Sequence, residues 1–102
     1  MTTTIAGTEV SVNAEGYLTD LNQWTKEIAQ EIATNEEVTM TEKTWEVIAW
    51  IQEQYRSENP LTIRKVGKSG ITDIKEFYAL FPNGPLKKAS KIAGIPKPVS
   101  CI

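Results

Sequence analysis

The only cysteine of this 102-residue sequence, Cys101, is the side chain whose chemistry can be stated first. The chain holds no second cysteine that could pair with it in an internal disulfide. A cysteine thiolate can attack a donor persulfide, and a second thiolate can then remove the transferred sulfur. Cys101 is therefore a candidate sulfur-carrying thiol. Most free cysteines are instead small buried hydrophobic residues, and the composition alone leaves this alternative open.

The residues before Cys101 predict an extended arm. Pro96 and Pro98 each fix φ, lack an N–H group and bias the preceding residue toward extended geometry. Gly94 is expected to end the helix that precedes them. We therefore expect residues 1–94 to form one domain and residues 95–102 to form a mobile carboxyl-terminal arm. At about 3 Å per residue, eight extended residues reach on the order of 25 Å, far enough to enter a pocket on another protein.

Composition excludes several classes of enzyme. The chain has no histidine and one cysteine, so His-ligated metal sites, cysteine-rich zinc sites, and Ser-His-Asp or Cys-His catalysis are all excluded. No cofactor-binding loop is recognisable either. We expect no metal, no cofactor and no stand-alone turnover.

The sequence also indicates a cytoplasmic protein. The first six residues lack the basic and apolar regions of a secretory signal, and no apolar run is long enough to span a bilayer. A free cysteine without a partner fits a reducing compartment. We therefore expect a cytoplasmic location and no membrane contact.

Charge is distributed unevenly along the chain. Residues 1–60 carry eleven acidic and three basic side chains, whereas residues 61–102 carry two acidic and eight basic ones. The basic part predicts an anionic partner, either an acidic protein surface or nucleic acid. The alternative is that the two parts neutralise each other across the fold. The candidate partner-binding residues are Arg64, Lys87, Lys88, Lys91 and Lys97.

The first third of the chain predicts a hairpin and a helix. Residues 5–17, approximately, have the pattern of a β-hairpin with its turn at Asn13–Gly16. Apolar residues at helical spacing predict a first helix over about 21–33, with Thr19 and Asp20 as capping candidates.

A second helix is predicted from a capping box formed by Thr39 and Glu42. Its broad apolar stripe is typical of the most buried helix of a small bundle. The stripe consists of Trp45, Val47, Ile48, Trp50, Ile51 and Tyr55. We expect all three tryptophans of the chain to contribute to the core, although an indole could instead stack on a base or ligand.

Three shorter helices are expected to follow. The first covers about 61–68, the second covers 73–81 with Thr72 as its cap, and the last begins near Pro85 and ends at Gly94. The predicted fold is therefore mainly α, a small helical bundle with an N-terminal β-hairpin, a helix-turn-helix-like core and an extended C-terminal arm. A non-catalytic regulatory protein or a DNA-binding helix-turn-helix protein is one alternative, and in the DNA-binding case Arg64, Lys65 and Lys68 would contact the duplex.

The carboxyl-terminal sequence resembles the DsrC/TusE family. The resemblance is carried by Leu80–Pro85, Ala89–Pro98 and Cys101–Ile102, and more loosely by Glu15–Leu18 and Trp45–Ile48. It implies a small helical protein with an amino-terminal hairpin and a mobile arm, whose penultimate cysteine carries sulfur as a persulfide. Members with two cysteines serve dissimilatory sulfite reductase and have their second cysteine eleven residues before the penultimate one. That position here is Ser90, which disfavours a role as a DsrC-like partner of sulfite reductase.

The resemblance therefore implies a single-cysteine, TusE-like relay protein, which would be a sulfurtransferase only in the sense that it carries a persulfide within a relay. Such a protein accepts sulfane sulfur from a TusBCD-type (DsrEFH-like) complex and passes it to a downstream acceptor. The implied acceptor is a tRNA 2-thiouridine synthetase of the MnmA type, or a related sulfur-trafficking protein. Contact with tRNA would be indirect, through that acceptor.

Overall fold

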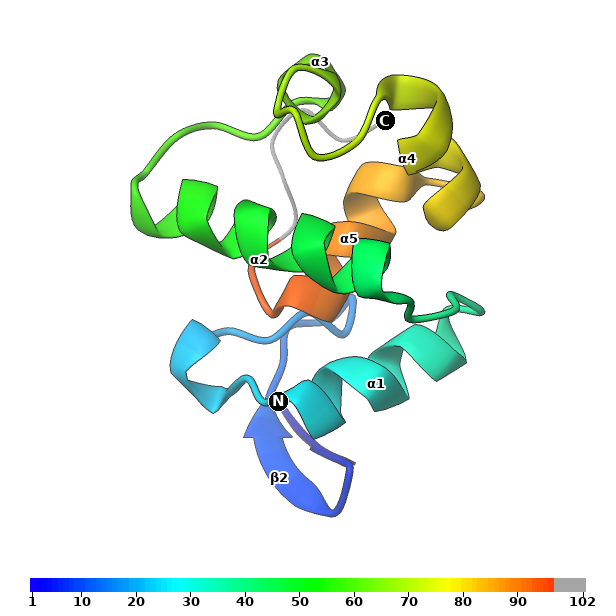
Figure 1. The fold of residues 1–102 in the computed structure, drawn as a ribbon. Helices are drawn as coiled ribbons and strands as arrows, with labels where there is room; N and C mark the ends of the chain where they lie inside the picture. Colours follow the sequence, from blue (N-terminus) through cyan, green and yellow to red (C-terminus); the bar gives the residue numbers. More distant parts are fainter. Residues whose placement is uncertain (97–102) are drawn as a thin grey trace.

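The computed structural model describes residues 1–96, so Lys97, Pro98 and Cys101 lie outside the described residues. The described part is mainly helical and begins with an antiparallel hairpin, as predicted (Figure 1). Its elements in chain order are β1 (Thr2–Ile5), β2 (Thr8–Ser11), the 3₁₀ helix η1 (Leu21–Gln23), α1 (Lys26–Asn35), α2 (Glu42–Arg56), α3 (Ile63–Gly67), α4 (Ile74–Leu80) and α5 (Pro85–Ala93). None of the helices among residues 1–96 combines the length and apolar character needed to cross a membrane.

The hairpin lies earlier in the chain than predicted. Its turn is formed by Ala6 and Gly7, both with positive φ, and pairs Ile5 with Thr8. The Asn13–Gly16 turn exists but closes only an isolated bridge between Val12 and Leu18. Glu31 of α1 accepts a hydrogen bond from the Ala6 N–H at 2.9 Å, a contact across 25 residues that the local pattern could not reveal.

The first predicted helix, 21–33, is divided in two. Trp24 is extended, with φ −70° and ψ 137°, and separates η1 from α1. The Thr25 hydroxyl caps α1 by accepting from the Ile28 N–H at 3.2 Å, while Asp20 caps η1. The helix therefore restarts after Trp24, because a threonine side chain satisfies the new amino-terminal N–H groups.

The predicted amino-terminal caps of α2 and α4 are wrong by one or two residues. Thr41, not Thr39, caps α2 and accepts from the Thr44 N–H at 3.3 Å. Asp73, not Thr72, caps α4 and accepts at 2.7 Å from the backbone N–H three residues later. Both errors are small displacements among neighbouring polar residues, each of which can act as a cap.

Helix α5 forms the centre of the core, because it packs against α1, α2 and α4. Figure 1 shows the hairpin beside α1 at one end of the molecule and α3 and α4 at the other. The largest buried apolar side chains include Phe77, Phe81, Ile51, Leu86 and Ile92. Each contributes about 1.5–3 kcal/mol through burial. The three tryptophans pack against this core but remain only partly buried.

Helix α5 begins and ends as predicted. Pro85 occupies its first turn, and Gly94 ends it in the left-handed conformation at φ +77°. A Cβ atom on Gly94 would lie 2.6 Å from Cδ1 of Trp24. Both the backbone conformation and the close approach of the indole therefore require glycine here.

We expect Gly94→Ala to lower the free energy of unfolding by about 2–4 kcal/mol, combining left-handed strain with a steric clash. Gly70→Ala is a matched control, since Gly70 has φ +82° but no atom of the described residues lies within 4 Å of an added Cβ. The control is expected to lose only about 1 kcal/mol. Urea unfolding of both variants measures the difference, and equal losses would contradict the proposed role of the indole contact.

Candidate functional site

The candidate site is the point at which the chain leaves α5. Ile95 is 1% exposed and belongs to the hydrophobic core, whereas Pro96 is exposed. Ile95 was expected to be the first residue of the arm, and its side chain instead packs inside the domain. The chain therefore passes from the core to the surface between Ile95 and Pro96.

The end of α5 is closed by two backbone hydrogen bonds. The Gly94 N–H donates to the Lys91 carbonyl at 3.2 Å, and the Ile95 N–H donates to the Ser90 carbonyl at 3.1 Å. This pair of bonds is the Schellman motif, which glycine favours. Two of the last four carbonyl groups of the helix are satisfied in this way.

Side chains from two other elements bind the remaining two carbonyls. The indole Nε1–H of Trp24 donates to the Ile92 carbonyl at 2.7 Å, and the Nε2–H of Gln52 donates to the Ala93 carbonyl at 2.8 Å. Gln52 is itself buried, with 6% of its surface exposed. We call Trp24, Gln52, Gly94 and Ile95 the arm base. An unsatisfied buried carbonyl would cost about 1–3 kcal/mol, so these donors stabilise the helix end.

Sequence reasoning did not identify Trp24 and Gln52 as site residues. The available signal for Gln52 was a polar side chain among the apolar positions of α2, beside Ile48 and Ile51. For Trp24 the sequence offered only a weaker indication, namely that this residue lies between two segments that each begin with a capping residue. In both cases the partner lies 41 or more residues away, so spacing alone could not reveal it.

The predicted basic residues of α5 have different environments. Lys88 donates to the Glu36 carbonyl at 2.9 Å, and Lys91 forms an ion pair with the Glu36 carboxylate at 3.6 Å. Lys91 also lies over the ring of Tyr17, at 5.9 Å from the ring centroid. Lys87 is exposed. Lys88 and Lys91 therefore tie α5 to the carboxyl end of α1, where the helix dipole favours cations.

The structure does not gather the candidate basic residues into one cluster. Arg64 is exposed on α3, which packs on α4, whereas Lys87, Lys88 and Lys91 lie on α5. Lys97 is outside the described residues. The ion pair of Lys91 with Glu36 shows that part of the basic charge is neutralised by the acidic half of the chain, whereas Lys88 binds a backbone carbonyl.

Ser90 lies on the buried face of α5 with 0% of its surface exposed. Its hydroxyl has no hydrogen-bond partner within residues 1–96. A buried hydroxyl without a partner is destabilising, and a less polar atom such as sulfur would fit this environment better.

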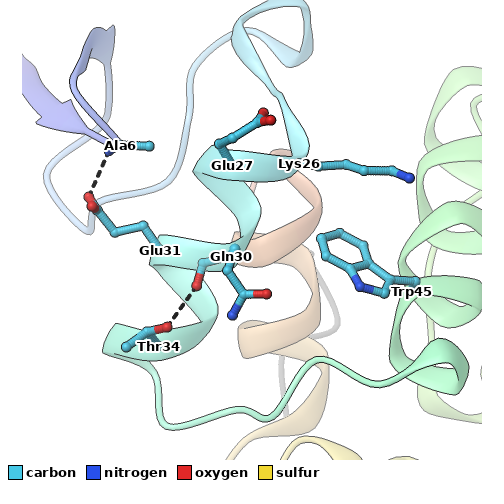
Figure 2. Close-up of a pocket in the computed structure, with 7 residues that line it drawn as sticks. All are labelled: Ala6, Lys26, Glu27, Gln30, Glu31, Thr34 and Trp45. Carbon is cyan, nitrogen blue, oxygen red and sulfur yellow. Dashed lines mark hydrogen bonds between the residues drawn. The ribbon is translucent and has the colours of Figure 1, made fainter.

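A shallow groove of about 570 Å³ lies between the hairpin turn, α1 and α2 (Figure 2). The Lys26 ammonium lies 5.8 Å from the centroid of the Trp45 ring along one wall. Glu31 lines the same groove and is bound to the Ala6 N–H. Among residues 1–96, none of the site residues predicted from the sequence lines this groove.

Comparison with known proteins identifies relatives that extend over nearly the whole chain. Residues 4–102 match the family model described as DsrC like protein. A relative named sulfurtransferase TusE, from Photorhabdus laumondii, is 43% identical in an alignment of 104 positions, gaps included, that covers 94% of each chain.

Two solved structures share the fold. The NMR structure of DsrC from Allochromatium vinosum has a TM-score of 0.81 and 34% identity, covering 99% of this chain and 97% of that one. The oxidized gamma-subunit of the dissimilatory sulfite reductase from Archaeoglobus fulgidus has a TM-score of 0.83 and 25% identity, covering 100% of both chains. The family match and these similarities agree with the helical fold and hairpin described above, and they show that this chain belongs to the DsrC family.

Proposed function

We propose that this protein is a sulfur carrier that holds sulfane sulfur as a persulfide on Cys101 and relays it between sulfurtransferase partners. The observation that carries the proposal is the 43% identity with sulfurtransferase TusE, in a chain whose only thiol is Cys101. Because the match with the family model runs to residue 102, it includes this cysteine.

The proposed transfer moves one sulfur atom without net oxidation or reduction. The Cys101 thiolate attacks the outer sulfur of a donor persulfide, and a new sulfur–sulfur bond forms as the donor's own bond breaks. The donor leaves as a thiolate, and the transferred sulfur keeps its proton. An acceptor thiolate then attacks that outer sulfur and releases Cys101 as a thiolate. Since no second thiol exists in the chain, the persulfide cannot be lost to an internal disulfide.

Partners follow from the same relay chemistry. We infer that a TusBCD-type (DsrEFH-like) complex supplies the sulfur in the cytoplasm and that a tRNA thiouridylase of the MnmA type accepts it. The likeness to TusE supports this assignment. Ser90 distinguishes the chain from two-cysteine members that serve sulfite reductase, because a hydroxyl cannot close the disulfide of that cycle. Lys87 and Arg64, both exposed, are available to contact an acidic partner surface.

Cys101→Ser is expected to abolish sulfur loading because the only nucleophilic sulfur is removed. Intact mass after incubation with a persulfide donor measures the gain of a sulfur atom, and a reductant should reverse it in the wild type. Thermal unfolding of the variant should match that of the wild type. Loading that persists in Cys101→Ser would refute the proposal.

Ser90→Cys is expected to restore the two-thiol chemistry of other family members. Under oxidation it should form an internal disulfide with Cys101, provided that the arm reaches the buried face of α5. The product should be two hydrogens lighter and resist alkylation, with Ser90→Ala as the control that retains one free thiol. Two alkylatable thiols after oxidation would show that the arm does not reach Ser90.

A further inference from the structure

We propose that Trp24 and Gln52 are positioning residues for sulfur transfer. Their N–H groups fix the direction in which the chain leaves the domain at Pro96, and so restrict the region in which Cys101 can be presented to a partner. The inference rests on the proposed carrier function, and it concerns presentation of the thiol rather than its reactivity.

The hydrogen bonds of the arm base extend beyond the backbone motif that ends α5. The two backbone bonds made by Gly94 and Ile95 already form a complete carboxyl-terminal motif. Trp24 and Gln52 then bind the Ile92 and Ala93 carbonyls, which at an ordinary surface would be solvated by water. These two donors come from the η1–α1 junction and from α2, so they hold the end of α5 between two separate elements.

Contacts around the exit restrict the backbone further. The Trp24 indole lies so close to Gly94 that a single Cβ atom would approach it to 2.6 Å. Ile95 is 1% exposed and anchors the next residue in the core. Rotation of the chain at the exit would therefore break the indole bond, expose Ile95, or both. Pro96, the first exposed residue after the arm base, also has a fixed φ.

The restriction matters for sulfur transfer because a small change of direction at the arm base displaces the far end of the segment that carries Cys101. Cys101 follows Pro96 by five residues, which span about 15 Å when extended. A tilt of about 20° at the arm base would move the end of such a segment by about 5 Å. Reacting atoms must approach within about 3–3.5 Å for transfer, so loosening the arm base would lower the fraction of productive encounters in a docked complex.

The test compares variants that alter one donor at a time in the full chain. Trp24→Phe keeps an aromatic ring beside Gly94 but removes the N–H group, and Gln52→Met removes the amide donor. Trp50→Phe is the matched control, because Trp50 is also partly buried against the core but binds neither carbonyl. Gln52→Arg is the rescue variant, since it restores an N–H donor and places a cation at a helix carboxyl end, which the dipole favours.

The first measurement requires no sulfur chemistry. A nitroxide is attached to Cys101, the only thiol, and paramagnetic broadening of backbone amides is mapped by NMR in each variant. We expect the set of broadened amides to change in Trp24→Phe and Gln52→Met, and to stay unchanged in Trp50→Phe. The wild-type set retained in both arm-base variants, or an equal change in Trp50→Phe, would overturn the positioning role.

The second measurement compares two sulfur donors. For each variant, the rate of Cys101 loading by a TusBCD-type complex is divided by the rate with glutathione persulfide, which needs no docking geometry. We expect this ratio to fall about tenfold in Trp24→Phe and Gln52→Met, to stay within about twofold in Trp50→Phe, and to recover in Gln52→Arg. A ratio unchanged in both arm-base variants would overturn the inference.

The two proposals fail in different ways. If wild-type protein accepts sulfur from neither donor, the carrier function fails, while the nitroxide map still decides whether Trp24 and Gln52 orient the arm. If wild-type protein loads normally and the donor ratio does not respond to the arm-base variants, only the positioning role fails.

Discussion

Hydrogen bonding to the last carbonyl groups of α5 couples the site to the rest of the fold. A nine-residue helix is marginal by itself and depends on tertiary packing. Here two of its terminal carbonyls are bound by Trp24 and Gln52, whose backbones belong to the η1–α1 junction and α2. These donors reach α5 only when the three helices are packed together. The exit of the arm is therefore formed by the same contacts that complete the core, and a folded domain implies an ordered arm base.

The contacts of α5 with α1 show how counting charges can mislead. The basic segment predicts an anionic partner, yet Lys88 and Lys91 both bind Glu36 within the protein. Glu36 lies at the carboxyl end of α1, where cations are stabilised by exposed carbonyls and by the helix dipole. These lysines thus hold two helices together, whereas exposed Lys87 and Arg64 remain available for a partner. A basic side chain can therefore be proposed to bind a partner only when its contacts within the protein have been examined.

Local signals predicted the two ends of α5 correctly, and long-range contacts account for what was missed. Pro85 and Gly94 are informative because each fixes or requires a particular φ whatever surrounds it. The Ala6–Gly7 turn instead depends partly on Glu31, and the function of Gln52 depends on a carbonyl 41 residues away. A glutamine among apolar positions indicates a buried polar contact but not its partner. The helical fold class was therefore predictable from the sequence, whereas the arm base was not.

Ser90 and Cys101 together determine how the proposed carrier keeps its sulfur. A persulfide beside a second thiol is short-lived, because that thiol can attack it and release sulfide. The buried hydroxyl of Ser90 cannot do so, although it makes no hydrogen bond within residues 1–96 and sulfur would suit its apolar surroundings. Serine at position 90 therefore leaves a buried hydroxyl without a partner among the described residues, and it supplies no thiol that could attack a persulfide on Cys101. In the proposed carrier, the sulfur would stay on Cys101 until an external thiolate arrives, and selectivity would depend on the partner to which the thiol is presented.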